Sequence, residues 1–295
     1  MRVLIGGGSG FIGRALRMHL KRQGHETVTI SRTKGPSKLT WDSIKTSGIP
    51  KCDAVINLAG ERVFSSRRWT PEFLADMRSS RIDTNEILVK AITESSEPPS
   101  VWLSSSAIGY YTASTGKTFT EDDVCADSSD MQTLCHDWEA SARLQESASA
   151  RTRHVTLRIG IVLGKSDGFF SNIKFPFSFG LGGVIGSGNQ AFPWIHQDDM
   201  VQLIGHAIAN DHVNGILNAV APNSTTNFSF TKAVGRAMCR PTIFWVPEFV
   251  VRSMLHRERA EMLLQVPNIV PKRTLELGYV FKYSDIESAI ADLIS

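Results

Sequence analysis

The chain has few cysteines, no long apolar run and no Cys-x-x-Cys pair. Its 295 residues include four cysteines, so reduced thiols are expected, in place of a disulfide framework or a zinc site. No apolar run reaches the roughly 20 residues of a membrane span, and the apolar start at Val3–Ile5 is too short for a signal peptide. A cytoplasmic protein is therefore expected, with an organelle such as the mitochondrion left open.

The chain also has no excess of one charge. Its 32 basic and 29 acidic side chains leave a formal net charge of +3, without a dense basic run. Neither nucleic acid nor a membrane surface is an expected partner. A small-molecule substrate is expected instead, and a homodimer is left open.

Short apolar runs alternate with longer amphipathic stretches in the first half of the chain. The expected strands cover 2–5, 26–30, 39–41, 53–58, 101–104 and 155–159, and the expected helices cover 11–23, 71–94 and 131–146. Thr70 and Pro71 have the residue types of an N-cap and a first helical position. This alternation predicts an α/β fold, a doubly wound parallel sheet of the Rossmann type.

Glycines and prolines are frequent after Gly164, which indicates loops around one short helix. We therefore expect a Rossmann domain at 1–163, with a late strand near 215–221 returning to the sheet. Residues 164–295 are expected to form mostly a smaller substrate-binding lobe, which includes a small C-terminal domain at about 240–288 with short helices.

The clearest motif is the glycine pattern that follows the first strand. Gly7 permits a tight turn, Gly10 lets the backbone approach a pyrophosphate, and Gly13 lets the helix pack closely on the strand. The N–H groups at the start of the helix would then bind the phosphates. The spacing is Gly-x-x-Gly-x-x-Gly rather than the commoner Gly-x-Gly-x-x-Gly, and its place between a strand and a helix predicts a dinucleotide site.

The end of the second strand indicates which dinucleotide binds. An NAD site usually has an acidic residue here, bonded to the ribose 2′-hydroxyl. This chain has Ser31 and Arg32, with Lys34 close by. A guanidinium can bind a 2′-phosphate that a carboxylate would repel. NADP(H) is therefore the expected cofactor, and a solvated basic turn is the alternative.

Five motifs in this order resemble the extended short-chain dehydrogenases/reductases, and more narrowly their atypical epimerase-family subgroup, family 39U. They are Gly7-x-x-Gly10-Phe11-Ile12-Gly13, Asn57-Leu58-Ala59-Gly60, Ser104 to Tyr111, Leu157-Arg158, and Trp194 to Asp199. Closer cues include Arg68-Trp69 and Trp138-Glu139. The resemblance covers essentially the whole chain and implies a Rossmann domain that binds NADP(H), with a small conserved C-terminal domain.

The resemblance also implies site residues. The cofactor would be lined by Gly7, Gly10, Phe11, Ile12, Gly13, Ser31, Arg32, Leu58 and Ala59. Arg81 resembles a family arginine near the phosphates, and Ile159 and Gly160 are candidates for the nicotinamide side. Ser106 matches the serine that polarises a substrate carbonyl in epimerases. The simpler alternatives are that Arg81 is a surface arginine of a helix and that Ser106 only forms a hydrogen bond to the backbone.

The usual Tyr-x-x-x-Lys pair is missing from this sequence. Tyr110 is followed four residues later by Ser114, and Tyr111 by Thr115. In the helix where the pair should lie, Leu134 and Trp138 take the two places. No lysine occurs between 118 and 164, so the superfamily's acid–base mechanism is in doubt.

Three residues are left as catalytic candidates: Ser106, Tyr111 and His196. His196 has a ring whose pKa suits proton transfer near neutral pH. No standard metal-ligand spacing occurs, and no metal is expected. The sequence therefore predicts an NADP(H)-dependent oxidoreductase or epimerase of an unknown small molecule. The alternative is an NADP(H)-binding sensor or scaffold with reduced catalysis.

Overall fold

A computed structural model describes every residue of the protein except 64–66, 68, 113–115 and 126–128, and every side chain of the others except those of 256–258. The chain folds into two compact units. Unit 1 comprises Met1–Tyr110, Asp127–Arg158 and Val201–Leu217. Unit 2 comprises Tyr111–Ala126, Ile159–Met200 and Asn218–Ser295.

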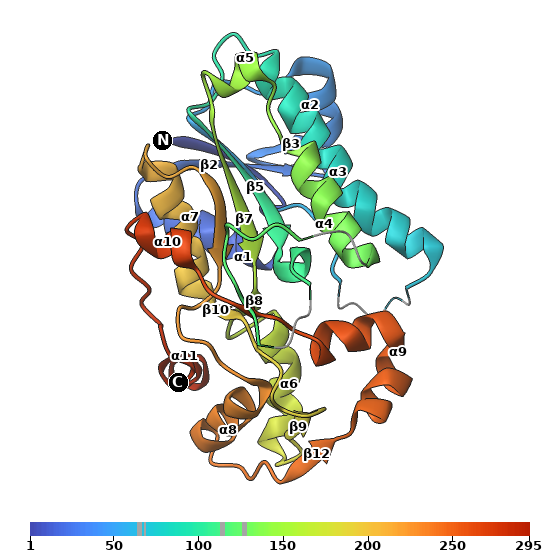
Figure 1. Ribbon diagram of the computed structural model, residues 1–295. Coiled ribbons are helices and arrows are strands. Elements are labelled where there is room, and N and C mark those ends of the chain that lie inside the picture. The colour runs from blue at the N-terminus through green and yellow to red at the C-terminus, as the bar shows by residue number, and fades with distance from the viewer. Residues whose placement is uncertain (64–66, 68, 113–115, 126–128) are drawn as a thin grey trace. The chain divides into compact units, whose positions relative to one another are not determined.

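Unit 1 is built on a seven-stranded sheet flanked by helices (Figure 1). Its strands are β1 (Arg2–Gly6), β2 (Glu26–Ser31), β3 (Lys38–Thr40), β4 (Ala54–Asn57), β5 (Val101–Ala107), β7 (Arg153–Ile159) and β11 (Gly215–Ala219). Its helices are α1 (Phe11–Arg22), α2 (Trp41–Ser47), α3 (Pro71–Thr93), α4 (Asp130–Ser141), α5 (Glu146–Ser149), the 3₁₀ helix η1 (Ile108–Tyr110) and α7 (Gln197–Ala209), whose residues up to Met200 belong to unit 2. Helices α2, α3 and α4 cover one face, and α1 and α7 cover the other.

The strand order β11-β7-β5-β4-β1-β2-β3 confirms the predicted doubly wound sheet. β1 pairs in parallel with both β2 and β4, in the registers Val3↔Thr27 and Val3↔Ala54. The chain moves outward from β1 to β2 and β3, and then outward on the other side through β4 and β5. In such sheets ligands bind beyond the carboxyl ends of the strands where the order reverses. Here that place lies after β1 and β4.

The predicted start of α3 is confirmed, with Thr70 as N-cap and Pro71 in the first turn. The Thr70 hydroxyl accepts a hydrogen bond from Phe73 N at 3.3 Å. On the face of the sheet beneath this helix, Leu88 and Ile92 are fully buried in one cluster with Trp102. Burying such side chains stabilises the fold by about 1.5–3 kcal/mol each.

Several boundaries differ from those expected from the sequence, such as the end of β5 at Ala107 instead of residue 104, and two of them have a clear local cause. Trp41 begins α2 instead of ending a strand, because Thr40 and Ser43 form a reciprocal capping box at 3.0 and 3.1 Å. Helix α4 ends at Ser141 instead of continuing to residue 146. The indole of Trp102 donates a hydrogen bond to the carbonyl of Ala142 at 2.9 Å, which satisfies one of the carbonyls left open at a helix end.

Unit 2 contains short parallel strand pairs and five complete helices among its described residues. The strands are β6 (Thr118–Phe119), β8 (Ile161–Leu163), β9 (Gly183–Ile185), β10 (Trp194–His196), β12 (Phe244–Val246) and β13 (Asn268–Ile269). The helices are α6 (Phe169–Ser178), α8 (Asn227–Ala237), α9 (Glu248–Leu264), the short α10 (Lys272–Glu276) and α11 (Ile286–Ile294). The expectation of short helices after residue 240 is wrong for α9, which has 17 residues.

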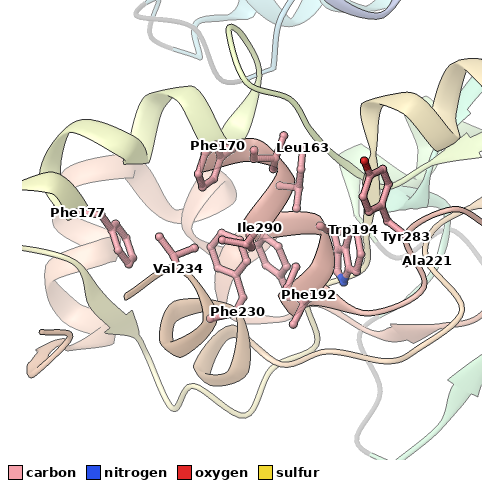
Figure 2. Packing of buried hydrophobic residues seen from close by; sticks show 14 residues of the cluster. Leu163, Phe170, Phe177, Phe192, Trp194, Ala221, Phe230, Val234, Tyr283 and Ile290 are labelled. Carbon is pink, nitrogen blue, oxygen red and sulfur yellow. The ribbon is translucent and has the colours of Figure 1, made fainter. Parts of the chain in front are cut away.

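The core of unit 2 combines aromatic and aliphatic side chains (Figure 2). Phe192 stacks on Phe230 with ring centroids 4.1 Å apart, and the indole of Trp194 donates to Thr225 Oγ1 at 3.1 Å. Phe177 is also buried, whereas Phe175 is 71% exposed. These phenylalanines therefore divide into core residues and surface residues.

The C-terminal segment of unit 2 is held by one buried carboxylate. Asp199 accepts hydrogen bonds from the Tyr279 hydroxyl at 2.9 Å, Lys282 N at 2.7 Å and Tyr283 N at 2.9 Å. The Asp199 side chain has no exposed surface. Asp199 lies in the first turn of α7, and its carboxylate binds the C-terminal segment at residues 279–283.

No described helix is long and apolar enough to cross a membrane.

The partly buried His154 makes the stability of unit 1 depend on pH. Burial, followed by the charge of Arg143, lowers the pKa of this imidazole from 6.5 to about 4. In the unfolded chain His154 therefore takes up a proton as the pH falls through 6.5, whereas in the folded chain it does so only near pH 4. Stability is complete above pH 6.5 and is lost as the pH falls toward 4. The loss corresponds to at most about 3 kcal/mol.

Urea unfolding between pH 7.5 and 4.5 measures this effect. The free energy of unfolding should fall with pH in the wild type, and more weakly in His154→Gln. Glutamine keeps a polar group near Ser104 Oγ, which lies 2.9 Å from the His154 ring nitrogen. Equal slopes for the two proteins would show that His154 is not the group responsible.

Candidate functional site

The glycine loop after β1 is shaped by close contacts within unit 1. Gly7 has φ of +73°, and a Cβ there would lie 2.6 Å from the carbonyl oxygen of Leu58. A Cβ at Gly13 would collide with the Gly7 carbonyl oxygen. Both positions therefore need glycine for the fold itself, and the loop lies against the residues Leu58 and Ala59 that follow β4.

Gly10 differs from the other two glycines. Its φ of −74° and ψ of −179° are open to any residue, and a Cβ would meet only the Gly7 carbonyl oxygen, at 3.2 Å. The helix that follows, with Phe11 and Ile12 in its first turn, has no side-chain cap and no acid in that turn. Its N–H groups are left for an anion, so this end of unit 1 fits a dinucleotide phosphate.

The end of β2 carries the predicted cofactor-selecting residues. The Ser31 hydroxyl donates to the Thr33 carbonyl at 2.6 Å, within the turn. Arg32 and Lys34 are exposed. Basic side chains thus lie beyond the end of β2, where the 2′-phosphate of NADP(H) would bind.

A buried amide network holds the residues after β4. Asn57 Nδ2 donates to Thr84 Oγ1 at 3.0 Å and to Asn85 Oδ1 at 2.8 Å, and Asn57 Oδ1 accepts from Ala59 N at 3.1 Å. The backbone of Leu58 and Ala59 is therefore fixed by α3. Asn85 could not be identified from the sequence, because nothing in its local pattern separates it from a surface amide.

Arg81 is buried beside this same segment. Its guanidinium donates to the carbonyls of Glu61 and Met77, each at 2.9 Å, and lies 4.9 Å from the ring centre of Trp138. Burial lowers the pKa of Arg81 from its usual value. The side chain supports the loop after β4 through backbone carbonyls, and its role near the phosphates stays a prediction.

At the carboxyl ends of β5 and β7, three side chains form a buried polar cluster. Ser106 Oγ donates to Glu139 Oε1 at 2.8 Å. Arg158 donates from Nε to the same oxygen at 2.8 Å and from Nη2 to Glu139 Oε2 at 2.9 Å. The side chains of Arg158 and Glu139 are only 2% and 11% exposed. We call these three residues the Ser–Glu–Arg cluster.

The Ser–Glu–Arg cluster is extended by two rings. The Arg158 guanidinium lies 3.3 Å from the ring centre of Tyr110, which stacks on His136 at 4.5 Å. Glu139 and His136 come from α4, the helix in which the Tyr-Lys pair would be expected. The sequence offered Trp138-Glu139 and Leu157-Arg158 only as family cues, so it missed that Glu139 and Arg158 meet.

Tyr111 and His196, the other two catalytic candidates, belong to unit 2 and are buried there. The Tyr111 hydroxyl lies 2.8 Å from Asn218 Oδ1 and 3.0 Å from the Thr120 carbonyl. His196 Nδ1 accepts from Asp198 N at 3.1 Å, and Nε2 lies 3.4 Å from Asp292 Oδ2. Burial lowers the pKa of His196, although nearby aspartates act in the opposite direction.

Gly160, a nicotinamide-side candidate with its neighbour Ile159, is also in unit 2. A Cβ at Gly160 would lie 2.6 Å from the Pro193 carbonyl oxygen, so glycine is needed for close packing. Three residues named in the sequence argument, Arg68, Ser114 and Thr115, lie outside the described residues. The rest of the chain contains no group of three or more metal-ligating side chains.

Comparisons with known proteins assign these features to a family. The NAD dependent epimerase/dehydratase family matches residues 3–219, and the Domain of unknown function (DUF1731) matches residues 246–293. Epimerase family protein SDR39U1 of Bos taurus is 44% identical over 297 residues, which cover 100% of both chains. Epimerase family protein YfhF of Bacillus subtilis is 34% identical and covers 100% of this chain and 98% of its own.

A solved structure has the same fold. The human epimerase family protein SDR39U1, crystallised as isoform 2 with NADPH, matches with a TM-score of 0.97 and 41% identity. The match covers 100% of this chain and 99% of the human one. The chain therefore belongs to the NAD dependent epimerase/dehydratase family, the extended short-chain dehydrogenases/reductases that its motifs resemble.

Proposed function

We propose that the protein is an NADP(H)-dependent oxidoreductase or epimerase of a small hydroxyl or carbonyl compound, in which the Ser–Glu–Arg cluster stands in place of the Tyr-Lys pair. The open glycine loop at Gly10 and the basic turn at Arg32 support the cofactor, as does the human neighbour solved with NADPH. The bond between Ser106 and Glu139 is the observation that carries the proposed chemistry.

The bound cofactor would supply or accept a hydride, and the protein must then move one proton. A serine hydroxyl has a single proton, and that of Ser106 is directed at the Glu139 carboxylate. A substrate hydroxyl can therefore donate to Ser106 Oγ. During oxidation the proton of the substrate hydroxyl would pass to Ser106, and the proton of Ser106 would pass to Glu139. The hydride would leave the carbon that carries this hydroxyl and go to the oxidised cofactor.

Arg158 opposes this proton transfer. Its two hydrogen bonds stabilise Glu139 as a carboxylate, so protonating Glu139 weakens both. A well-tuned acid or base contributes about 10²–10⁴-fold to a rate, and this arrangement should give little of that. Ser106 is also 1% exposed, so a substrate reaches it only if the groups that cover it move.

We therefore expect slow or undetectable turnover on ordinary ketones and nucleotide sugars, together with tight NADPH binding. NADPH consumption and UDP-sugar epimerisation by the purified protein would be measured beside a thermal-shift titration with NADPH. Rapid epimerisation of a UDP-sugar would contradict the proposed chemistry, and the absence of an NADPH shift would contradict the cofactor.

If a substrate is found, two matched variants distinguish the candidate proton donors. Ser106→Ala should lower kcat because it removes the proposed relay, whereas Tyr111→Phe removes only a hydroxyl that is bonded within unit 2. NADPH binding should be unchanged in both. A fall in kcat for Tyr111→Phe alone would identify Tyr111 as the proton donor. An unchanged kcat in both variants would leave His196 as the candidate.

The second candidate function is an NADP(H)-binding sensor or scaffold. The bidentate Arg158–Glu139 pair favours it, because the pair uses up the carboxylate that a relay needs. NADPH binding without turnover on a broad set of alcohols and carbonyl compounds would support this second function over the first.

A further inference from the structure

Positive charge is concentrated in the first part of the chain. Residues 1–41 carry eight of the 32 basic residues but only one of the 29 acidic residues, Glu26. Glu26 is already paired, since its carboxylate lies 3.2 Å from Arg2 Nε. Glu26 is therefore the one carboxylate that this segment offers to its eight cations.

Two cations of this group lie against the loop itself: Arg14, which donates to the Ser9 carbonyl at 3.1 Å, and Arg17. The Cδ of Arg17 is 3.2 Å from the place that a Cβ on Gly8 would take, so the side chain extends from α1 across Gly8. Its Nε is buried, and no hydrogen bond or ion pair joins Arg17 to another described residue. The buried Thr29 Oγ1, on the neighbouring strand, also has no described partner.

Gly8 is a glycine that the dinucleotide motif does not require, because it stands at one of the variable places. Its φ is not in the positive region, so its backbone does not require glycine either. A Cβ at this position would lie 2.7 Å from Thr29 Oγ1 and 3.2 Å from Arg17 Cδ. The missing side chain at Gly8 thus makes room for Arg17 to reach β2.

β2 leads directly to the cofactor-selecting turn. Side chains two residues apart on a strand share a face and lie about 6–7 Å apart. Ser31 therefore follows Thr29 on the face that Arg17 approaches. In this fold the residues at that strand end bind the adenosine ribose at its 2′-position. The guanidinium of Arg17 extends several ångströms beyond Cδ, which is enough to approach the end of β2.

We propose that Arg17 is a second ligand of the 2′-phosphate of NADP(H), reaching it from α1 across Gly8 while Arg32 reaches it from the end of β2. This inference rests on the proposed use of NADP(H). Two planar guanidinium groups on one phosphate give directional, charge-assisted hydrogen bonds that a 2′-hydroxyl cannot replace. Arg17 thus contributes to the choice between NADP(H) and NAD(H).

The test compares two cofactor fragments that differ only in the phosphate concerned. Adenosine 2′,5′-bisphosphate and 5′-AMP would be titrated by calorimetry into wild type, Arg17→Ala and the matched control Arg22→Ala, which removes the same charge from the last turn of the same helix. Arg17→Ala should weaken the bisphosphate about tenfold and leave 5′-AMP unchanged. A tenfold change is about 1.4 kcal/mol. Arg22→Ala should change neither.

Two further variants check the geometry. Arg32→Ala should weaken the bisphosphate selectively as well, and Gly8→Ala should act like a mild Arg17→Ala because its methyl group displaces that side chain. Unfolding midpoints without ligand show whether each variant is folded. An equal loss on both fragments would place Arg17 at the 5′-phosphate and overturn the proposal, as would no loss on either. A wild type that binds neither fragment would instead refute the proposed cofactor.

Discussion

Replacing Gly10 with valine is expected to abolish NADPH binding while the protein remains folded. The backbone of Gly10 is in an ordinary extended conformation, and a Cβ there meets only one atom, at 3.2 Å. The valine side chain would instead fill the space in front of the first N–H groups of α1, where a phosphate has to lie. The fold therefore tolerates the change, but the ligand does not.

Thermal-shift titration measures this outcome. A ligand at a hundredfold excess over its Kd stabilises the native state by about 2.7 kcal/mol, and the variant should show none of this. Gly13→Val is the matched contrast, because a Cβ at Gly13 collides with the Gly7 carbonyl oxygen. That variant should unfold more easily even without ligand. A Gly10→Val protein that keeps the full NADPH shift would show that the phosphate lies elsewhere.

Replacing Arg158 with leucine is expected to destabilise the protein by about 3–5 kcal/mol, because it leaves the buried Glu139 carboxylate without its charged partner. Removing both charges together, in Arg158→Leu with Glu139→Leu, should cost much less than the sum of the two single changes. The pair's attraction is offset by the loss of hydration of both charges, whereas a single buried charge has no compensation.

A double-mutant cycle in urea measures the coupling between Arg158 and Glu139. The coupling energy should be at the upper end of the 0.5–3 kcal/mol found for residues in contact. If the single changes were additive, the two groups would not interact as the structure places them. Glu139→Gln is a milder variant for use if a leucine variant fails to fold, since the amide keeps an acceptor for Ser106.

The sequence predicted those parts of the fold that depend on residues close together in the chain. The start of α3 at Thr70 and Pro71 is such a case, since a cap and a fixed φ act within one turn. The glycine spacing is another, because the strand, turn and helix lie within 22 residues of the start. The doubly wound parallel sheet followed from the alternation of strands and helices, whereas the strand order came from the structure.

The Ser–Glu–Arg cluster could not be predicted in the same way. Ser106 and Glu139 are 33 residues apart, and Arg158 is a further 19 beyond. Each is an ordinary polar residue within its own segment, and only the packing of α4 against the ends of β5 and β7 brings them together. The family resemblance named Ser106 and gave Glu139 and Arg158 only within motifs, and the missing Tyr-Lys pair indicated that a replacement was needed without joining the three.

The carboxylate of Asp199 has a consequence for how the chain can be divided or recombined. Its hydrogen-bond partners come from residues 279–283, inside the region matched by the domain of unknown function. A protein cut before residue 279 would keep a buried negative charge with its donors removed. A tail exchanged between relatives must therefore bring hydrogen-bond donors that match position 199, some eighty residues upstream, so the two segments have to be chosen together.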